Sequence, residues 1–294
     1  MSGVEPYTLT MAQVAQSGRA CIVIDDSGTP GQVAESMYLH PERKTWVAVL
    51  MTHCQIEEVC AQLPGALDEL KSQTGANEFH FMDIYRGSGR FASVSFERRL
   101  AFFAFMQHIF TQFMFPVLVQ TFDPVDLRDL KTRFAIPKKV GPFNTKHPSD
   151  AALLFLLLRI KRYLERHPND FVLPGYVVLD EGFRPSGRSI EISTWGDVLQ
   201  RSSIYTARSE IFLPIQLADY AAFCVGRCQW LLSKEKRSRS DDVFFPIIAD
   251  LRANIVNLSE MIVDLGDWKP DDYGRMIEQD RDRKGLSRKY ETDP

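Results

Sequence analysis

The sequence has few cysteines, and none of them lies in the paired spacing of a structural zinc site. They are Cys21, Cys54, Cys60, Cys224 and Cys228. Cys224 and Cys228 stand four residues apart in an apolar helical pattern, so we interpret both as small core residues. A chain of 294 residues can bury a core that needs no disulfides. Free thiols and the lack of a signal peptide lead us to expect a cytoplasmic protein.

Long apolar runs and an excess of positive charge are also missing. The apolar stretch 151–158 is too short to cross a bilayer, and the stretch 101–122 is interrupted by polar residues and by Pro116. The sequence therefore predicts no membrane partner. The net charge is −3, so any contact with nucleic acid must come from local basic patches.

The strongest pattern in the chain is a short apolar strand that ends in two acidic residues. Residues 21–24 are apolar, and Asp25, Asp26, Ser27 and Gly28 follow directly. Adjacent residues on a strand point to opposite faces, so only one aspartate can share a site on a given side of the sheet. A carboxylate at the end of a buried strand costs free energy unless it is paired, hydrogen-bonded or bound to a metal. We predict that Asp25 anchors a metal-dependent site. For Asp26 and Ser27 the alternative stays open that they cap the turn that leaves the strand.

The pattern of an apolar strand followed by two acids and a glycine occurs a second time. Residues 176–179 are apolar, and Asp180, Glu181 and Gly182 follow them. If the two strands lie in one sheet, Asp180 is a second candidate ligand for the same metal site.

A third acidic candidate lies in a helix predicted over residues 214–234, which is apolar on most sides and therefore buried. Gln216 and Asp219 stand three residues apart on one face of this helix. A buried, unpaired aspartate would take up a proton or destabilise the fold, and a bound metal removes that conflict. An ion pair with Arg227 or Arg208 would remove it too, and this alternative stays open. Three small residues would let the helix approach the sheet closely: Ala218, Ala222 and Gly226.

Two further segments complete the candidate site. Residues 78–85 alternate polar and apolar side chains, which predicts an extended segment with Glu78 and His80 on one face. Residues 123–150 lack clear periodicity and carry Lys138 and Lys139. A long basic connection of this kind can contact phosphate groups, and a solvated surface loop is the alternative.

Four stretches together resemble the bacterial domain-of-unknown-function family 3800. They are VIDDSG at 23–28, EFHFMDIY at 78–85, VVLDE at 177–181 and IQLADYA at 215–221. The resemblance implies an RNase H-like fold and a metal-dependent nuclease or a related phosphotransfer enzyme. It also implies that Asp25, Asp180 and Asp219 bind metal, with Glu78 and His80 as further site residues.

The patterns predict an α/β fold in which helices flank an RNase H-like mixed sheet. Three consecutive strands over 20–27, 36–40 and 45–52 are expected to form an antiparallel meander at its start. We expect the RNase H-like domain to span residues 18–235 and a C-terminal helical extension with the tail to span 236–294.

The predicted function is hydrolysis of phosphodiester bonds in nucleic acid, either DNA or RNA. Clustered carboxylates suit two Mg²⁺ or Mn²⁺ ions about 4 Å apart, which activate water and stabilise the leaving oxygen. The predicted contacts to substrate are Ser27, Lys138, Lys139 and Gln216. Two alternatives stay open: an inactive module of a mobile-element or defence system that binds nucleic acid or protein, and a small-molecule phosphodiesterase.

Overall fold

The protein is built around a six-stranded mixed sheet. The computed structural model describes residues 9–27, 39–134, 136–257 and 269–289. Within them the strand order of this sheet is β3-β2-β1-β6-β8-β7. The strands are β1 (Cys21–Ser27), β2 (Lys44–Met51), β3 (Val117–Phe122), β6 (Gly175–Asp180), β7 (Ser189–Glu191) and β8 (Leu199–Ala207). A separate hairpin consists of β4 (Lys139–Val140) and β5 (Phe143–Asn144).

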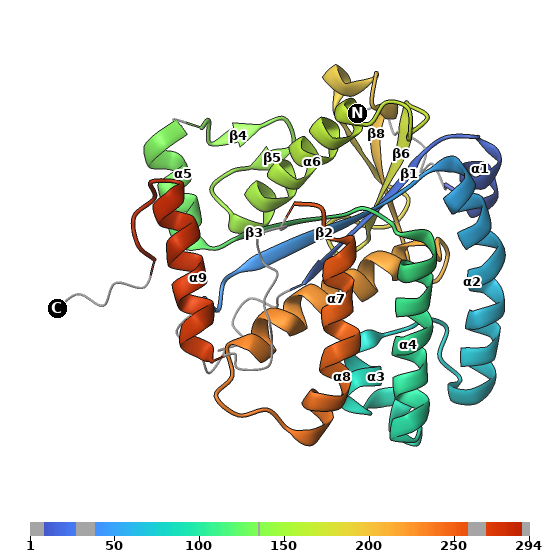
Figure 1. The fold of residues 1–294 in the computed structure, drawn as a ribbon. Coiled ribbons are helices and arrows are strands. Elements are labelled where there is room, and N and C mark those ends of the chain that lie inside the picture. Colours follow the sequence, from blue (N-terminus) through green and yellow to red (C-terminus); the bar gives the residue numbers. More distant parts are fainter. Residues whose placement is uncertain (1–8, 28–38, 135, 258–268, 290–294) are drawn as a thin grey trace.

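Helices cover both faces of the sheet (Figure 1), so the predicted α/β class is confirmed. One face is covered by α2 (His53–Thr74), α4 (Phe96–Phe113) and α7 (Ile215–Leu232), with α8 (Arg239–Asp250) packed against α4 and α7. The other face is covered by α6 (Pro148–Arg166) and α5 (Pro124–Phe134). The remaining α-helices in the described ranges are α1 (Met11–Gln16), α3 (Phe81–Arg86) and α9 (Pro270–Arg283). None of the described helices is long and apolar enough to cross a membrane.

The central strand β1 divides its side chains between two cores. Cys21 and Val23 pack in the core beneath α7, and Ile22 and Ile24 pack in the core beneath α6. All four are fully buried. A strand buried on both faces is apolar at every position, which explains why this run does not alternate with polar residues.

The antiparallel meander uses a different third strand from the one that the sequence predicts. In the structure it consists of β1, β2 and β3, with Ala48 of β2 opposite both Ile24 and Leu118. Most of the predicted strand 36–40 lies outside the described residues, and residues 39–40 are not in a strand. The actual third strand arrives after α2, α3 and α4, because the chain first covers one face of the sheet.

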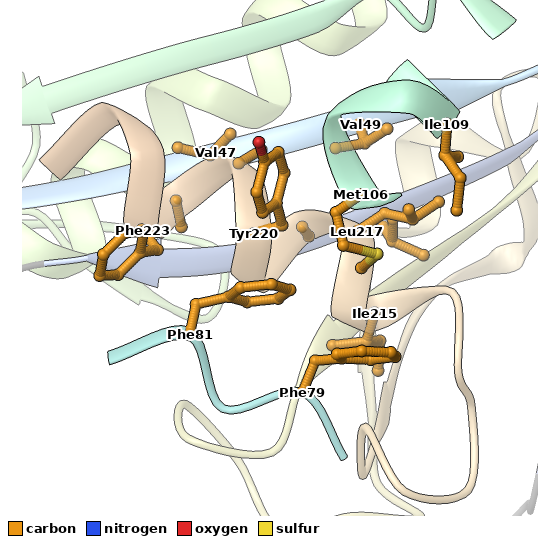
Figure 2. Packing of buried hydrophobic residues seen from close by; sticks show 14 of the residues in the cluster. Val47, Val49, Phe79, Phe81, Met106, Ile109, Ile215, Leu217, Tyr220 and Phe223 are labelled. Atoms are coloured by element: carbon orange, nitrogen blue, oxygen red, sulfur yellow. The ribbon is translucent and has the colours of Figure 1, made fainter. Parts of the chain in front are cut away.

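The prediction that residues 78–85 form an extended segment is wrong for most of this stretch. Helix α3 begins at Phe81 and ends at Arg86. Figure 2 shows Phe79 and Phe81 lying along α7, close to Ile215 and Tyr220. The two phenylalanine rings are stacked, with centroids 6.0 Å apart. The alternation therefore reflects the burial of these two rings and not a strand.

Residues 123–150 are also more ordered than their sequence suggests. Helix α5 and the β4–β5 hairpin occupy much of this stretch. Asp123 accepts a hydrogen bond from the backbone N–H of Val125 at the start of α5. The expected irregular loop is thus a helix and a hairpin that lead into α6.

The C-terminal helix α9, within the predicted extension 236–294, is held against α5 by ion pairs. Arg281 contacts Asp126 at 3.0 Å and also pairs with Asp129. Lys289 contacts Asp123 at 2.5 Å and Asp126 at 3.1 Å. Because Arg281 is only 4% exposed, these pairs form a largely desolvated clamp.

Candidate functional site

The two strand-end aspartates lie at the same edge of the sheet because β1 and β6 are parallel neighbours. The ladder between these strands runs up to Ile24 and Leu179, and Asp25 and Asp180 are the next residues. Strand β8 is parallel to β6 and places Ala207 opposite Asp180. The carboxyl ends of three neighbouring strands therefore meet here.

Alternation along the strands directs Asp25 and Asp180 to the face that α7 covers. Val23 and Val178, two residues earlier in each strand, pack in the core on this face. Asp26 belongs to the opposite face and forms an ion pair with Lys44 at the start of β2. Its charge still reaches the other face, because repulsion from Asp26 is a smaller contribution that raises the pKa of both Asp25 and Asp219.

Asp219 approaches this edge from α7, which packs very closely against β1. Gly226 on α7 leaves no room for a side chain, because a Cβ there would overlap the hydroxyl of Ser27 and lie 3.1 Å from its Cβ. The small residue at this position therefore sets the distance between the helix and the strand, as the sequence predicts. Ser27, a predicted substrate contact, packs against this point of the helix.

The two arginines considered as partners for Asp219 are paired elsewhere. Arg227 contacts Asp241 at 2.8 Å, and Arg208 contacts Glu210 at 3.0 Å. Among the residues that the structure describes, no lysine, arginine or histidine forms an ion pair with Asp219. The same holds for Asp25 and Asp180, so this group of carboxylates is not neutralised by the described part of the chain.

The carboxylates at this edge raise one another's pKa. Burial, followed by repulsion from Glu78 and Asp180, raises the pKa of Asp219 to about 8. Burial, followed by repulsion from Asp219 and Asp180, raises the pKa of Asp25 well above its usual value. Burial also raises the pKa of Asp180, against the lowering effect of hydrogen bonds from the N–H groups of Gly182 and Glu181. The four carboxylates of Asp25, Glu78, Asp180 and Asp219 therefore form one interacting group, which we call the acidic cluster.

Glu78 is positioned by a small set of hydrogen bonds. The hydroxyl of Ser209, just beyond β8, donates to the Glu78 carboxylate. The Gln216 side chain accepts from the backbone N–H of Phe79 at 3.0 Å and donates to the Ser209 carbonyl at 3.2 Å. Gln216 is only 2% exposed, so it joins the two loops that hold Glu78 and does not face solvent. Sequence reasoning missed Ser209, because its partner lies 131 residues away and no local motif marks it.

The structure does not place the remaining predicted residues in the acidic cluster. The side chain of His80 is 54% exposed, and its Nδ1 lies 3.0 Å from Asp83. Lys138 and Lys139 lie at the exposed start of the β4–β5 hairpin, which packs beside α6 on the other face of the sheet. A role for His80 and these lysines stays a prediction.

The acidic cluster has the chemistry of a site for a hard cation. Its donors are carboxylate oxygens, which Mg²⁺ and Mn²⁺ prefer. Asp25, Asp180 and Asp219 are each partly exposed, so a cation from solvent can reach their carboxylates. Within the described residues no three acidic, histidine or cysteine side chains already form a coordination group. Carboxylates that repel one another stay apart without a cation, so these donors are not held together as a preformed coordination group in the described residues.

Comparison of the chain with models of protein families, with curated proteins and with solved structures gave no match.

Gly226→Ala is expected to destabilise the protein by about 2 kcal/mol, because the new methyl group has to push α7 away from Ser27. Urea unfolding measures this free energy. In a Ser27→Gly background the same change is expected to cost far less, which is the test of the contact. Gly65→Ala is the matched control: this glycine lies in helix α2 with open space around it, so alanine is expected to stabilise by about 1 kcal/mol. Equal costs at the two glycines would contradict the close approach.

Proposed function

We propose that this protein is a metal-dependent nuclease whose mixed sheet and helices form an RNase H-like domain. The observation that carries the proposal is the acidic cluster. Four carboxylates from two parallel strands, a buried helix and a loop gather at one edge of the sheet, and no described cation neutralises them. Burying such a group lowers stability, so it needs a compensating role. The sequence resemblance to a family considered RNase H-like supports the same proposal.

In this proposal Asp25, Asp180 and Asp219 hold one or two Mg²⁺ or Mn²⁺ ions. Such ions, when bound, lower the pKa of water and stabilise the leaving oxygen of a phosphodiester. Glu78 is the residue best suited to accept a proton from water, because Ser209 fixes its carboxylate and its charge acts on Asp180 and Asp219. His80 is a weaker candidate, since it turns toward solvent and Asp83.

A cleavage assay tests the proposal directly. Labelled single-stranded and double-stranded DNA, RNA and an RNA–DNA hybrid are incubated with the protein in Mg²⁺, Mn²⁺ or EDTA. We expect cleavage of at least one substrate with metal, none in EDTA, and none by Asp25→Asn. Calorimetry with Mn²⁺ is the second measurement. A folded wild-type protein that binds no Mn²⁺ would overturn the proposal.

A further inference from the structure

A groove opens on the face of the sheet opposite α7, between α5 and the start of α6. Its volume is about 500 Å³. The side chains that matter here are Arg128 and Thr132 of α5, Lys146 and His147 just before α6, and Glu42 in the turn before β2. We call this feature the α5–α6 groove.

The α5–α6 groove lies at the same edge of the sheet as the acidic cluster. The indole N–H of Trp46 donates to the backbone carbonyl of Ser149 in the first turn of α6, at 2.9 Å. Trp46 stands opposite Asp26 in the β1–β2 ladder. Phe183, three residues after Asp180, packs edge-to-face on Trp46 with ring centroids 5.8 Å apart. Trp46 thus joins the start of α6 to the ends of both acid-bearing strands.

The charge in the α5–α6 groove is predominantly positive. Arg128 and Lys146 are exposed, and neither forms an ion pair with any residue that the structure describes. Glu42 is the acidic side chain of the described lining. The groove also faces the positive end of the α6 dipole, where the N-cap residue His147 makes no side-chain capping hydrogen bond.

The C-terminal clamp keeps the negative charges of α5 out of this groove. Asp123 and Asp126 pair with Lys289, and Asp126 and Asp129 pair with Arg281. All three aspartates belong to α5 or precede it directly, yet each is neutralised by a cation from the C-terminal part of the chain. Arg128 on the same helix has no ion-pair partner among the described residues, so the clamp separates the two signs of charge.

We propose that the α5–α6 groove binds a backbone phosphate of the nucleic-acid strand that the acidic cluster cleaves. This inference rests on the proposed function. Before metal binds, the acidic cluster repels phosphate groups, so attraction for the strand has to come from cations beside it. Arg128 and Lys146 supply that attraction at the same edge of the sheet. In this proposal Arg128 and Lys146 are the principal phosphate contacts, and a contact from Lys138 or Lys139 stays a separate prediction.

The test is the binding of a fluorescein-labelled 12-nucleotide single strand, of DNA and of RNA, measured by fluorescence anisotropy in EDTA to prevent cleavage. We expect Arg128→Glu/Lys146→Glu to weaken binding by at least 10-fold at low salt. We also expect the slope of log Kd against log salt concentration to fall by about 1.4, because each lost contact with a single strand contributes about 0.7.

The matched control is Arg162→Glu/Arg166→Glu, which makes the same change of charge toward the other end of α6. This pair is expected to leave the salt slope unchanged. Unchanged binding by the groove variant, or an equal loss in both pairs, would overturn the inference. Inorganic phosphate that binds as tightly as the oligonucleotide would overturn it too, because the groove would then be a site for the free ion.

Calorimetry with Mn²⁺ separates this inference from the proposed function. The groove variant is expected to bind Mn²⁺ as the wild type does, since its substitutions do not touch the acidic cluster. If the wild type cleaves with metal and the groove variant binds the strand as the wild type does, the groove inference is overturned and the proposed nuclease function stands. If strand binding depends on the groove but the protein binds no Mn²⁺, the proposed nuclease function is overturned and the groove inference stands.

Discussion

Asp219→Asn is expected to stabilise the metal-free protein and, at the same time, to abolish Mn²⁺ binding and cleavage. Burial and neighbouring carboxylates raise the pKa of Asp219 to about 8, so the folded protein retains a proton that the unfolded chain has released. Stability therefore falls as the pH rises from about 4, the usual pKa of aspartate, to about 8. Asparagine has no such penalty. Because Asp219 keeps some solvent exposure, we expect a gain on the order of 2 kcal/mol above pH 8.

Urea unfolding in EDTA at several pH values measures this gain. The difference between Asp219→Asn and the wild type is expected to be small near pH 4 and largest above pH 8. Added Mn²⁺ is expected to raise the melting temperature of the wild type and to leave that of the variant unchanged. Asp197→Asn is the control, because Asp197 is 67% exposed and lies 3.3 Å from Lys161. A variant less stable than the wild type at pH 8 would show that Asp219 is paired in a way that the structure does not contain.

Asp241→Asn is expected to destabilise the protein by about 3 kcal/mol. This is the opposite of the effect expected for Asp219→Asn, although Asp241 lies on α8, which packs beside α7. The side chain of Asp241 is 3% exposed and lies 2.8 Å from Arg227 and 3.3 Å from Lys234. It also accepts hydrogen bonds from the Tyr85 hydroxyl and from the N–H of Ser238. Loss of its charge leaves the Arg227 guanidinium without its carboxylate partner in a largely buried position.

The pH dependence of this second effect has the opposite sign to that of Asp219. Burial by itself raises the pKa of Asp241, but the hydrogen bonds and the Arg227 charge outweigh it and hold the pKa well below its usual value. Its contribution is therefore complete above about pH 4 and is lost as the pH falls further. Urea unfolding at pH 7 and pH 3 measures the difference. Asp242→Asn is the control: its side chain is 63% exposed and 3.9 Å from Arg237, so a change below about 0.5 kcal/mol is expected.

The positions of Asp25, Asp180 and Asp219 follow from local patterns that a sequence displays directly. An apolar run with an acid at its end indicates a buried strand and the edge at which it stops. Two such runs bring their acids together only if the strands are parallel neighbours, and the ladder between β1 and β6 meets that condition. The apolar helix around Asp219 indicates that this aspartate is buried, but the sequence does not show which residue or ion interacts with it.

Other parts of the site depend on contacts that no local pattern encodes. The alternation of polar and apolar residues over 78–85 is compatible with a strand, and it is also compatible with a turn that buries two aromatic side chains. The packing of Phe79 and Phe81 shows that the second interpretation is correct. Ser209 meets Glu78 only because two distant loops converge. Lys138 and Lys139 are adjacent in the sequence and are therefore easily identified as a basic pair. Arg128 and Lys146 are distant in the sequence, and only the packing of α5 beside the start of α6 brings them into one groove.

The place of β1 in the sheet also determines when the acidic cluster can form as the chain folds. Strand β2 follows β1 closely in the sequence. The other neighbour of β1 in the sheet is β6, which follows only after helices α2 to α6. Pairing over such a separation requires the closure of a long loop and is slow. During synthesis β1 therefore has an open edge that can pair with other chains, until β6 covers it. Because Asp180 and Asp219 both follow that gap, the repulsion among the acids arises only after β1, β2 and β3 have been synthesised and can already pair with one another.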